Sequence, residues 1–277
     1  MTFLLQSISE HQCAKRLGLL LLPMLLSIAP GALLALDGEA LRQQLRSPDR
    51  AIADRMRDDA RKPVEVLEFL DLQPGMTALD VYAADGYYTL IMAWAVGEQG
   101  RVHAQNSPAV QRYEDDPTAS PQPDGLALKI TQHELTNVER VDRAITATDL
   151  ADESVDFVLL SQILHDYYNR SPARAHTMLR ELHRVLRDGG VIGVIDHTGA
   201  AGNNNARLHR MEKAQAVEAL QRAGFTIEAE SDILANPADN PRRSTFDPAL
   251  NRQTDQFLLR GRKSVSTDTD TPADTRP

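Results

Sequence analysis

Two histidine–aspartate pairs, His165-Asp166 and Asp196-His197, have the residue types best suited to chemistry in this chain. Each pair stands shortly after an apolar run. Histidine titrates near neutral pH and can act as a general base, and a neighbouring carboxylate can orient an imidazole or bind a substrate cation. We predict that all four residues are catalytic. The alternative is that Asp166 caps the next helix and that both histidines are ordinary loop residues.

A third histidine precedes an arginine, as His209-Arg210, next to the start of a predicted helix. We predict that both side chains bind an anionic group of the substrate, and the alternative is a solvated helix start. Together with the two pairs, His209 also forms a possible metal-binding set, and histidine-rich sets prefer transition metals over magnesium. No HxxxH-type spacing lies on one helix. We therefore assign no metal and keep a metal-dependent enzyme as a third alternative.

A strand–loop–helix segment upstream of these residues has the composition of a ligand-binding turn. The β-prone run Thr77–Tyr82 is followed by Ala-Ala-Asp-Gly and then by an apolar helix, Tyr87–Val96. Small residues in such a turn let the backbone come close to a ligand. The alternative is a tight turn in a doubly wound protein of another kind.

Alternating strands and helices are needed to position these residues. Apolar runs predict strands at 77–82, 101–105, 138–145, 155–161, 191–195, 225–231 and 255–260. Helices are predicted within 37–72, where Ser47-Pro48-Asp49 would start one, and at 87–96, 126–135, 172–187 and 212–223. Right-handed crossovers make sequential strands parallel, which predicts an open, doubly wound α/β sheet. The ligand of such a sheet lies beyond the carboxyl ends of its strands, where the candidate residues would meet.

The segment that begins at Asp80 resembles the first motif of class I S-adenosylmethionine-dependent methyltransferases, an acidic residue followed by three alternate glycines. Asp80 matches the acid, and the glycine positions hold Tyr82, Ala84 and Gly86, so one glycine is kept. Asn106, after the second predicted strand, matches the acid that binds the ribose hydroxyls and can still form hydrogen bonds. Segments 154–158, 182–190 and 223–225 resemble later motifs of the family in the right order.

This resemblance implies a Rossmann-like, seven-stranded sheet, mostly parallel with an antiparallel last strand. It also implies S-adenosylmethionine as the cofactor, bound by Asp80, Tyr82, Ala84, Gly86, Tyr87 and Asn106. A narrower resemblance is to a group of small, exported bacterial predicted methyltransferases. That group carries both histidine–aspartate pairs, a Leu-His-Arg stretch, here Leu208–Arg210, and an ANPAD segment, here Ala235–Asp239.

The function implied is methyl transfer from S-adenosylmethionine to an unidentified small molecule. The alternative is a non-catalytic, exported binding protein that retains the methyltransferase fold. Two facts favour this alternative: the glycine motif is degraded, and the methyl donor is a cytoplasmic metabolite whereas the chain has the pattern of an exported protein.

The N-terminus has the pattern of a secretory signal. Lys15-Arg16 precede an uncharged run, 17–36, that ends in small residues, and an uncleaved membrane anchor is the alternative. Without residues 1–36 the chain has 28 basic and 38 acidic side chains, a net charge of −10, and no cysteine. We therefore predict a periplasmic domain, 37–262, with no nucleic-acid partner and with membrane contact only through the leader. Residues 263–277 are predicted to be a disordered tail.

Overall fold

The computed structural model describes residues 35–108 and 124–265. Most of the predicted leader, residues 109–123 and the predicted tail from residue 266 onward lie outside the described residues, so the predictions of a leader and a disordered tail stay predictions. Within the described ranges, no helix is both long enough and apolar enough to cross a membrane.

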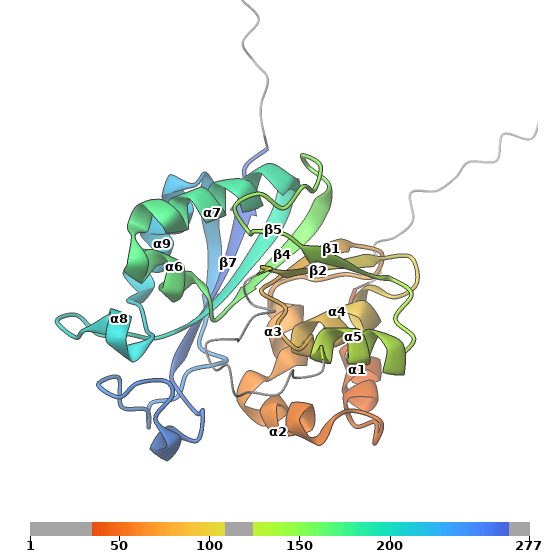
Figure 1. Ribbon diagram of the computed structural model, residues 1–277, viewed down its shortest axis with the longest axis horizontal. Coiled ribbons are helices and arrows are strands. Elements are labelled where there is room, and N and C mark those ends of the chain that lie inside the picture. The colour runs from red at the N-terminus through yellow and green to blue at the C-terminus, as the bar shows by residue number, and fades with distance from the viewer. Residues whose placement is uncertain (1–34, 109–123, 266–277) are drawn as a thin grey trace, which may run out of the picture. The chain divides into compact units, whose positions relative to one another are not determined.

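Seven strands form one sheet in the order β3-β2-β1-β4-β5-β7-β6 (Figure 1). Their bounds are β1 Thr77–Val81, β2 Arg101–Asn106, β3 Val138–Asp142, β4 Val155–Ser161, β5 Leu186–His197, β6 Phe225–Ser231 and β7 Gln256–Lys263. The first five strands pair in parallel, and β7 runs antiparallel to both of its neighbours. The predicted seven-stranded sheet, mostly parallel with an antiparallel last strand, is therefore confirmed.

Helices cover both faces of this sheet (Figure 1). Their bounds are α1 Gly38–Leu45, α2 Ile52–Arg61, α3 Pro63–Phe69, α4 Tyr87–Val96, α5 Gly125–Gln132, α6 Leu164–Arg170, α7 Pro172–Val185, α8 Asn205–Leu208 and α9 Lys213–Arg222. Strand β4 shows why two layers form, because its side chains alternate between two apolar cores. Phe157 and Leu159 pack with α1, α3 and α4, whereas Val158 and Leu160 pack with α7 and α9.

The predicted helix start at Ser47-Pro48-Asp49 is wrong, because these residues form a turn and α2 begins at Ile52. The Ser47 hydroxyl accepts from the Asp49 N–H at 3.3 Å, which closes a local turn instead of capping a helix. The fully buried Arg50 then donates to the Leu45 carbonyl at 2.9 Å and to Asp58 at 2.5 Å. This buried guanidinium ties the end of α1 to α2.

Three strand boundaries also move by three or more residues. Strand β3 ends at Asp142, earlier than predicted, whereas β5 begins at Leu186, inside the predicted helix 172–187, because Leu186 pairs with Val155 beside a bulge. Strand β7 extends to Lys263, whose buried ammonium group donates to the Leu186 carbonyl at 2.8 Å. The sheet therefore takes in a residue that we predicted to be in the tail.

Candidate active site

The turn between β1 and α4 holds three residues in the left-handed region of backbone conformation. Tyr82 has a φ of 53°, Ala84 of 51° and Gly86 of 83°. These are the three alternate positions at which the resemblance expects glycine. A positive φ is uncommon for residues other than glycine and persists where the surroundings enforce it. The turn Tyr82–Gly86, here called the donor loop, thus keeps the backbone form of a glycine motif without two of its glycines.

The side chains at the end of β2 hold the donor loop in this form. Asn106 accepts from the Ala84 N–H at 2.9 Å and donates to the Ala84 carbonyl at 3.2 Å. Gln105 accepts from the Tyr82 N–H at 3.1 Å through its side chain. Asn106 is buried, and both polar atoms of its amide are used by the loop. The structure therefore places Asn106 as a brace of the loop, and not among the residues that line the cavity described next.

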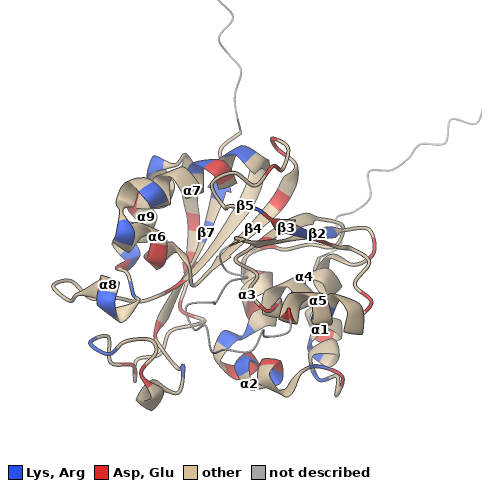
Figure 2. Cartoon of the chain, in the orientation of Figure 1, with Lys and Arg blue, Asp and Glu red and all other residues tan. Residues whose placement is uncertain are grey.

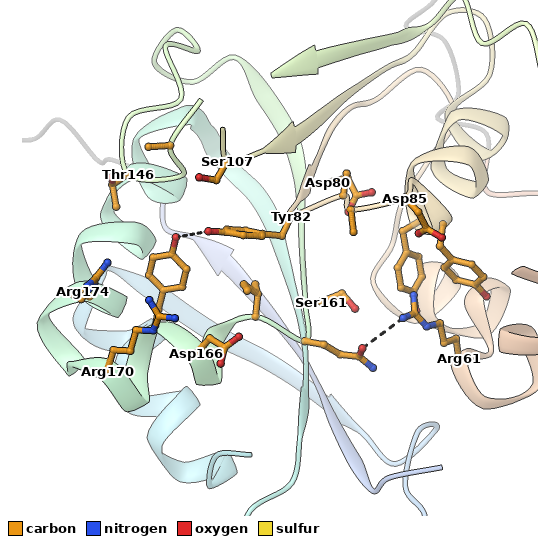
Figure 3. A pocket seen from close by; sticks show the side chains of 18 of the residues that line it. Arg61, Asp80, Tyr82, Asp85, Ser107, Thr146, Ser161, Asp166, Arg170 and Arg174 are labelled. Atoms are coloured by element: carbon orange, nitrogen blue, oxygen red, sulfur yellow. Dashed lines mark hydrogen bonds between the residues drawn. The ribbon is translucent and has the colours of Figure 1, made fainter. Parts of the chain in front are cut away.

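A cavity of about 1050 Å³ opens beyond the carboxyl ends of β1, β2 and β4, where a doubly wound sheet holds its ligand (Figure 3). Four of the predicted cofactor residues line it, namely Asp80, Tyr82, Ala84 and Tyr87. Gly86 does not, because the position of its missing Cβ faces α5, 2.8 Å from a methyl of Leu126. Of the predicted catalytic and substrate residues, Asp166 is the one that lines the cavity.

Asp80 lies at the floor of this cavity and is 3% exposed. Its carboxylate accepts from the Thr89 hydroxyl at 2.6 Å. Burial raises the pKa of Asp80 to about 7, against the opposing effects of the Thr89 hydrogen bond and the charge of Arg61. Asp80 is thus a carboxyl group that titrates near neutral pH, beside the donor loop.

Tyr82 and Tyr167 both line the cavity and contact each other there. Their hydroxyl groups lie 2.8 Å apart, and Figure 3 shows the Tyr82 ring reaching across to its partner on α6. Burial raises the pKa of Tyr167 above its usual range. The large residue at the first glycine position therefore has a partner of its own inside the cavity.

Helix α2 supplies two arginines, Arg57 and Arg61, that line the cavity and that we did not predict as site residues. Arg57 pairs with Asp85 of the donor loop at 2.7 Å, and the guanidinium groups of Arg57 and Arg61 lie 4.8 and 4.6 Å from the centre of the Tyr87 ring. Tyr87 in turn donates to Asp58 at 2.8 Å. Figure 2 shows basic and acidic residues together on α2. Arginines four positions apart on one amphipathic helix were the available signal, because such residues share a face.

Asp196, near the end of β5, and His165, in the first turn of α6 after β4, form a buried pair. Asp196 Oδ1 lies 2.7 Å from His165 Nδ1, and its other oxygen accepts from the His165 N–H at 2.9 Å. Burial lowers the pKa of His165, but the hydrogen bond and the charge of Asp196 outweigh burial and raise that pKa above its usual value. The structure thus joins two predicted catalytic residues, one on β5 and one on the helix that follows the adjacent strand β4.

His197 is turned to a different partner. Its Nδ1 lies 2.7 Å from the Thr254 hydroxyl, and burial lowers its pKa to about 4. Its ring packs against the His165 ring with centroids 5.8 Å apart. At neutral pH His197 is therefore an uncharged neighbour of the His165–Asp196 pair.

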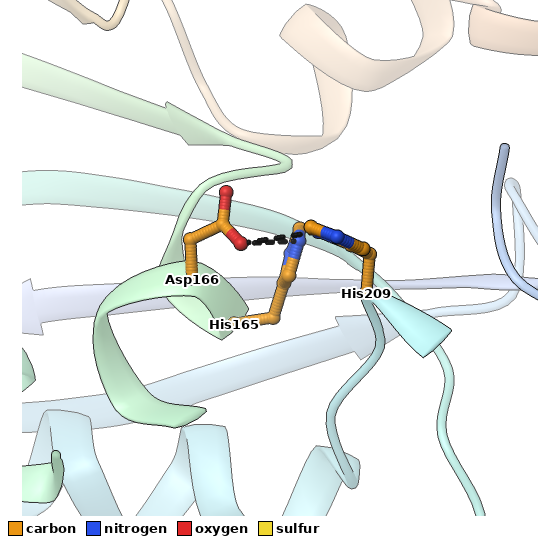
Figure 4. A group of neighbouring side chains, drawn as sticks. All are labelled: His165, Asp166 and His209. Atoms are coloured by element: carbon orange, nitrogen blue, oxygen red, sulfur yellow. Dashed lines mark ion pairs between the residues drawn. The ribbon is translucent and has the colours of Figure 1, made fainter. Parts of the chain in front are cut away.

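His209 lies beside Asp166, one of the residues with which we grouped it as a possible metal-binding set. It ends α8 with a φ of 53°, and its Nδ1 lies 3.2 Å from Asp166 Oδ1. The same oxygen lies 3.4 Å from His165 Nε2, so one carboxylate faces two imidazoles (Figure 4). His165, Asp166 and His209 are called the histidine cluster below.

Arg210 does not reach the cavity, in contrast to the predicted substrate contact. It is fully buried and forms two bonds to Asp239, at 2.7 and 3.1 Å. It also donates to the carbonyls of Thr198 and Arg243 at 2.9 and 3.0 Å. Because its donors are used inside the protein, Arg210 has a structural role, and the ANPAD segment supplies its partner.

Two protein-family models match parts of this chain. The methyltransferase domain model matches residues 119–194, and the protein-L-isoaspartate(D-aspartate) O-methyltransferase model matches residues 61–111. Demethylmenaquinone methyltransferase of Bacillus cereus is 28% identical over 132 residues, which are 46% of this chain and 47% of that protein. The chain therefore spans about half the length of the curated relatives that it matches.

Solved structures share the fold. A SAM dependent methyltransferase from Aquifex aeolicus matches with a TM-score of 0.54 and 19% identity, over 81% of this chain and 97% of that one. The [4+2]-cyclase SpnF matches with a TM-score of 0.52 and 17% identity, over 82% of this chain and 93% of that one. The strand order and the solved structures show that this chain has the fold of the class I S-adenosylmethionine-dependent methyltransferases, and two methyltransferase family models match parts of it.

Proposed function

We propose that this protein transfers the methyl group of S-adenosylmethionine to a small molecule held in the cavity. The observation that carries the proposal is the donor loop, which has three left-handed residues and which lines, through Tyr82 and Ala84, a ligand-sized cavity at the expected end of the sheet. Family and fold imply S-adenosylmethionine as the cofactor, and when bound it supplies an electrophilic methyl group.

The cavity residues fit this cofactor in most respects. The backbone of the donor loop has the form that lets the chain approach a ligand closely, and Asp80, Ala84 and Tyr87 line the space beside it. They depart from the family at the ribose position, because the Asn106 amide is engaged with Ala84. Ser107, the next residue, lines the cavity there.

The opposite wall would hold the acceptor. Asp166 and Tyr167 of α6 line it, and the other two residues of the histidine cluster, His165 and His209, contact Asp166 without lining the cavity. Methyl transfer needs donor and acceptor in line, so an acceptor between the two walls would be oriented from both sides. If the acceptor must lose a proton, the polar groups of the histidine cluster would assist its deprotonation.

Cationic side chains on this wall favour an acceptor with an anionic group. Arg170 and Arg174 line the cavity, and no carboxylate of the described residues pairs with either guanidinium group. Guanidinium groups recognise carboxylates and phosphates through paired hydrogen bonds. Demethylmenaquinone, for which the Bacillus cereus relative is named, is an uncharged compound. Its rate of methylation by this protein can be compared with the rates for anionic acceptors.

Isothermal titration of the full chain with S-adenosylmethionine tests the proposal. We expect saturable binding and competition by S-adenosylhomocysteine, followed by release of S-adenosylhomocysteine when a suitable acceptor is added. The control is the Tyr82→Gly/Ala84→Gly double variant, which restores the glycine motif. If the natural chain binds no donor at millimolar concentration and the double variant does, the proposal is wrong.

That outcome would support the second candidate, a non-catalytic binding protein that keeps the fold. The observation in its favour is the pair of non-glycine residues in the donor loop, because Tyr82 fills part of the space near the cofactor position. The likeness to SpnF, a [4+2]-cyclase, shows that one fold carries more than one chemistry.

We also propose that the protein is exported. Support comes from the basic pair Lys15-Arg16 and the uncharged run that follows it. N-terminal sequencing of the protein recovered from the periplasm would locate the cleavage site, and a cytoplasmic protein with an intact leader would contradict this proposal.

A further inference from the structure

The histidine cluster has the composition and spacing of a metal site. We propose that His165, Asp166 and His209 bind one divalent transition-metal ion of the Zn²⁺ type on the acceptor wall of the cavity. Two imidazoles and one carboxylate suit such ions, and catalytic zinc sites use three protein ligands of these kinds.

The distances from Asp166 to the two histidines are those expected between ligands of one metal ion. Asp166 Oδ1 lies 3.4 Å from His165 Nε2 and 3.2 Å from His209 Nδ1, and the three ligand atoms lie within 4.8 Å of one another. Neither Asp166 contact has hydrogen-bond geometry. The His165 contact to Asp196 does, at 2.7 Å. Ligands about 2.0–2.1 Å from a tetrahedral zinc ion are about 3.3–3.4 Å apart, which agrees with both Asp166 distances.

Asp196 provides the support that metal-binding histidines usually have. It is fully buried and accepts at His165 Nδ1, so that the Nε2 atom of the same ring is directed toward Asp166. A carboxylate behind a ligating histidine holds the tautomer and the ring orientation and increases the basicity of the ligand. Asp196 is thus a positioning residue for this site, and the short His165–Asp196 bond has a role beyond packing.

His209 is also held in place by its surroundings. Its left-handed backbone lies between α8 and Arg210, and that arginine is anchored by Asp239. The ring packs edge-on against Phe246, with centroids 4.7 Å apart. A non-glycine residue in this conformation is strained, and such strain clusters at functional sites. This strained backbone conformation places the His209 ring beside Asp166.

The remaining coordination position of the ion would face the cavity, because Asp166 and Phe246 both line it. This role rests on the proposed function: an oxygen of the acceptor would occupy the open position, where the ion orients it toward the donor loop. Metal binding itself does not depend on the donor, so the two proposals can fail separately.

The test is calorimetric titration of the full, chelator-treated chain with Zn²⁺, in the absence of S-adenosylmethionine. We expect one Zn²⁺ per chain, and with Co²⁺ the visible absorption of a tetrahedral complex. His209→Ala and Asp166→Asn should each weaken Zn²⁺ binding at least tenfold, and Asp196→Asn about 10–100-fold. The matched control is His176→Ala, because His176 lies on α7 outside the cluster.

Thermal unfolding of each variant would show that it is folded before it is titrated. No Zn²⁺ binding by the natural chain, or equal Zn²⁺ affinity in the natural chain and in His209→Ala, would overturn the metal site. Donor binding is measured separately on the chelated chain, so loss of that binding would count against the methyl-transfer proposal alone.

Discussion

The two walls of the cavity are built in different ways. The donor loop consists of five consecutive residues, and its backbone conformation forms one wall. It keeps this conformation although Tyr82 and Ala84 stand at positions where the family motif has glycine. The histidine cluster is made of side chains from two separate segments, after β4 and after α8, with Asp196 of β5 behind them. A wall made of backbone tolerates changes of side chain, whereas a wall made of side chains depends on each residue.

The largest expected effect is on the free energy of unfolding, and it comes from replacing Arg210, which anchors the segment that carries His209 of the histidine cluster. Arg210→Met leaves the buried Asp239 carboxylate without its partner, so we expect a loss of about 3–5 kcal/mol of folding free energy. Urea unfolding measures it. If Arg210 contacts the substrate instead, the variant would keep its stability and lose affinity for the acceptor.

A smaller effect concerns Asp80 and depends on pH. Its pKa is raised to about 7 in the folded protein, so the ionised carboxylate opposes folding. The folded state loses stability as pH rises through the unfolded value of about 4, and the loss is complete above about pH 7. Asp80→Asn should therefore be more stable than the natural chain by about 3 kcal/mol at pH 8, with a smaller difference at pH 5.

Unfolding curves at both pH values provide the measurement. A difference in stability that is independent of pH would show that burial does not perturb Asp80. Thr89→Val is a useful companion variant, because it removes the 2.6 Å hydrogen bond to the carboxylate and should raise the pKa of Asp80 further.

Substitutions of Asn106 test whether its side chain supports the donor loop or contacts the ribose of the cofactor. Asn106→Ala leaves the N–H and carbonyl of Ala84 without partners, and we expect a loss of about 2 kcal/mol of stability and about tenfold weaker donor binding. Asn106→Asp restores the acid of the family but cannot donate to the Ala84 carbonyl. Tighter donor binding by Asn106→Asp, seen by calorimetry, would mean that this side chain contacts ribose after all.

The smallest effect tests the strain in the donor loop. Glycine adopts a positive φ without steric cost but loses more entropy on folding, so Ala84→Gly should change stability by about +0.5 kcal/mol. Thermal unfolding would detect this gain. A clear loss of stability would indicate that the Ala84 methyl group makes packing contacts that outweigh the strain.

Much of the fold could be predicted from the sequence because its signals are local. The runs that form β4 and β6 and the apolar helix α4 were predicted with the bounds that the structure has. The boundaries that moved, at Leu186 and Lys263, depend on pairing with distant strands. The helix predicted to start at Ser47 failed because the buried Arg50 reorganises that turn.

The candidate site likewise has one part that the sequence predicted and another part that depends on contacts between distant segments. The sequence by itself determined that the two histidine–aspartate pairs lie near each other, because the carboxyl ends of neighbouring parallel strands lie at one edge of the sheet, and the structure showed that His165 contacts Asp196. Only the tertiary structure decided that His209 joins Asp166, that His197 turns to Thr254, and that Arg210 is buried. The physical reason is that a buried polar side chain takes the partner that satisfies its hydrogen bonds, and these partners come from remote parts of the chain.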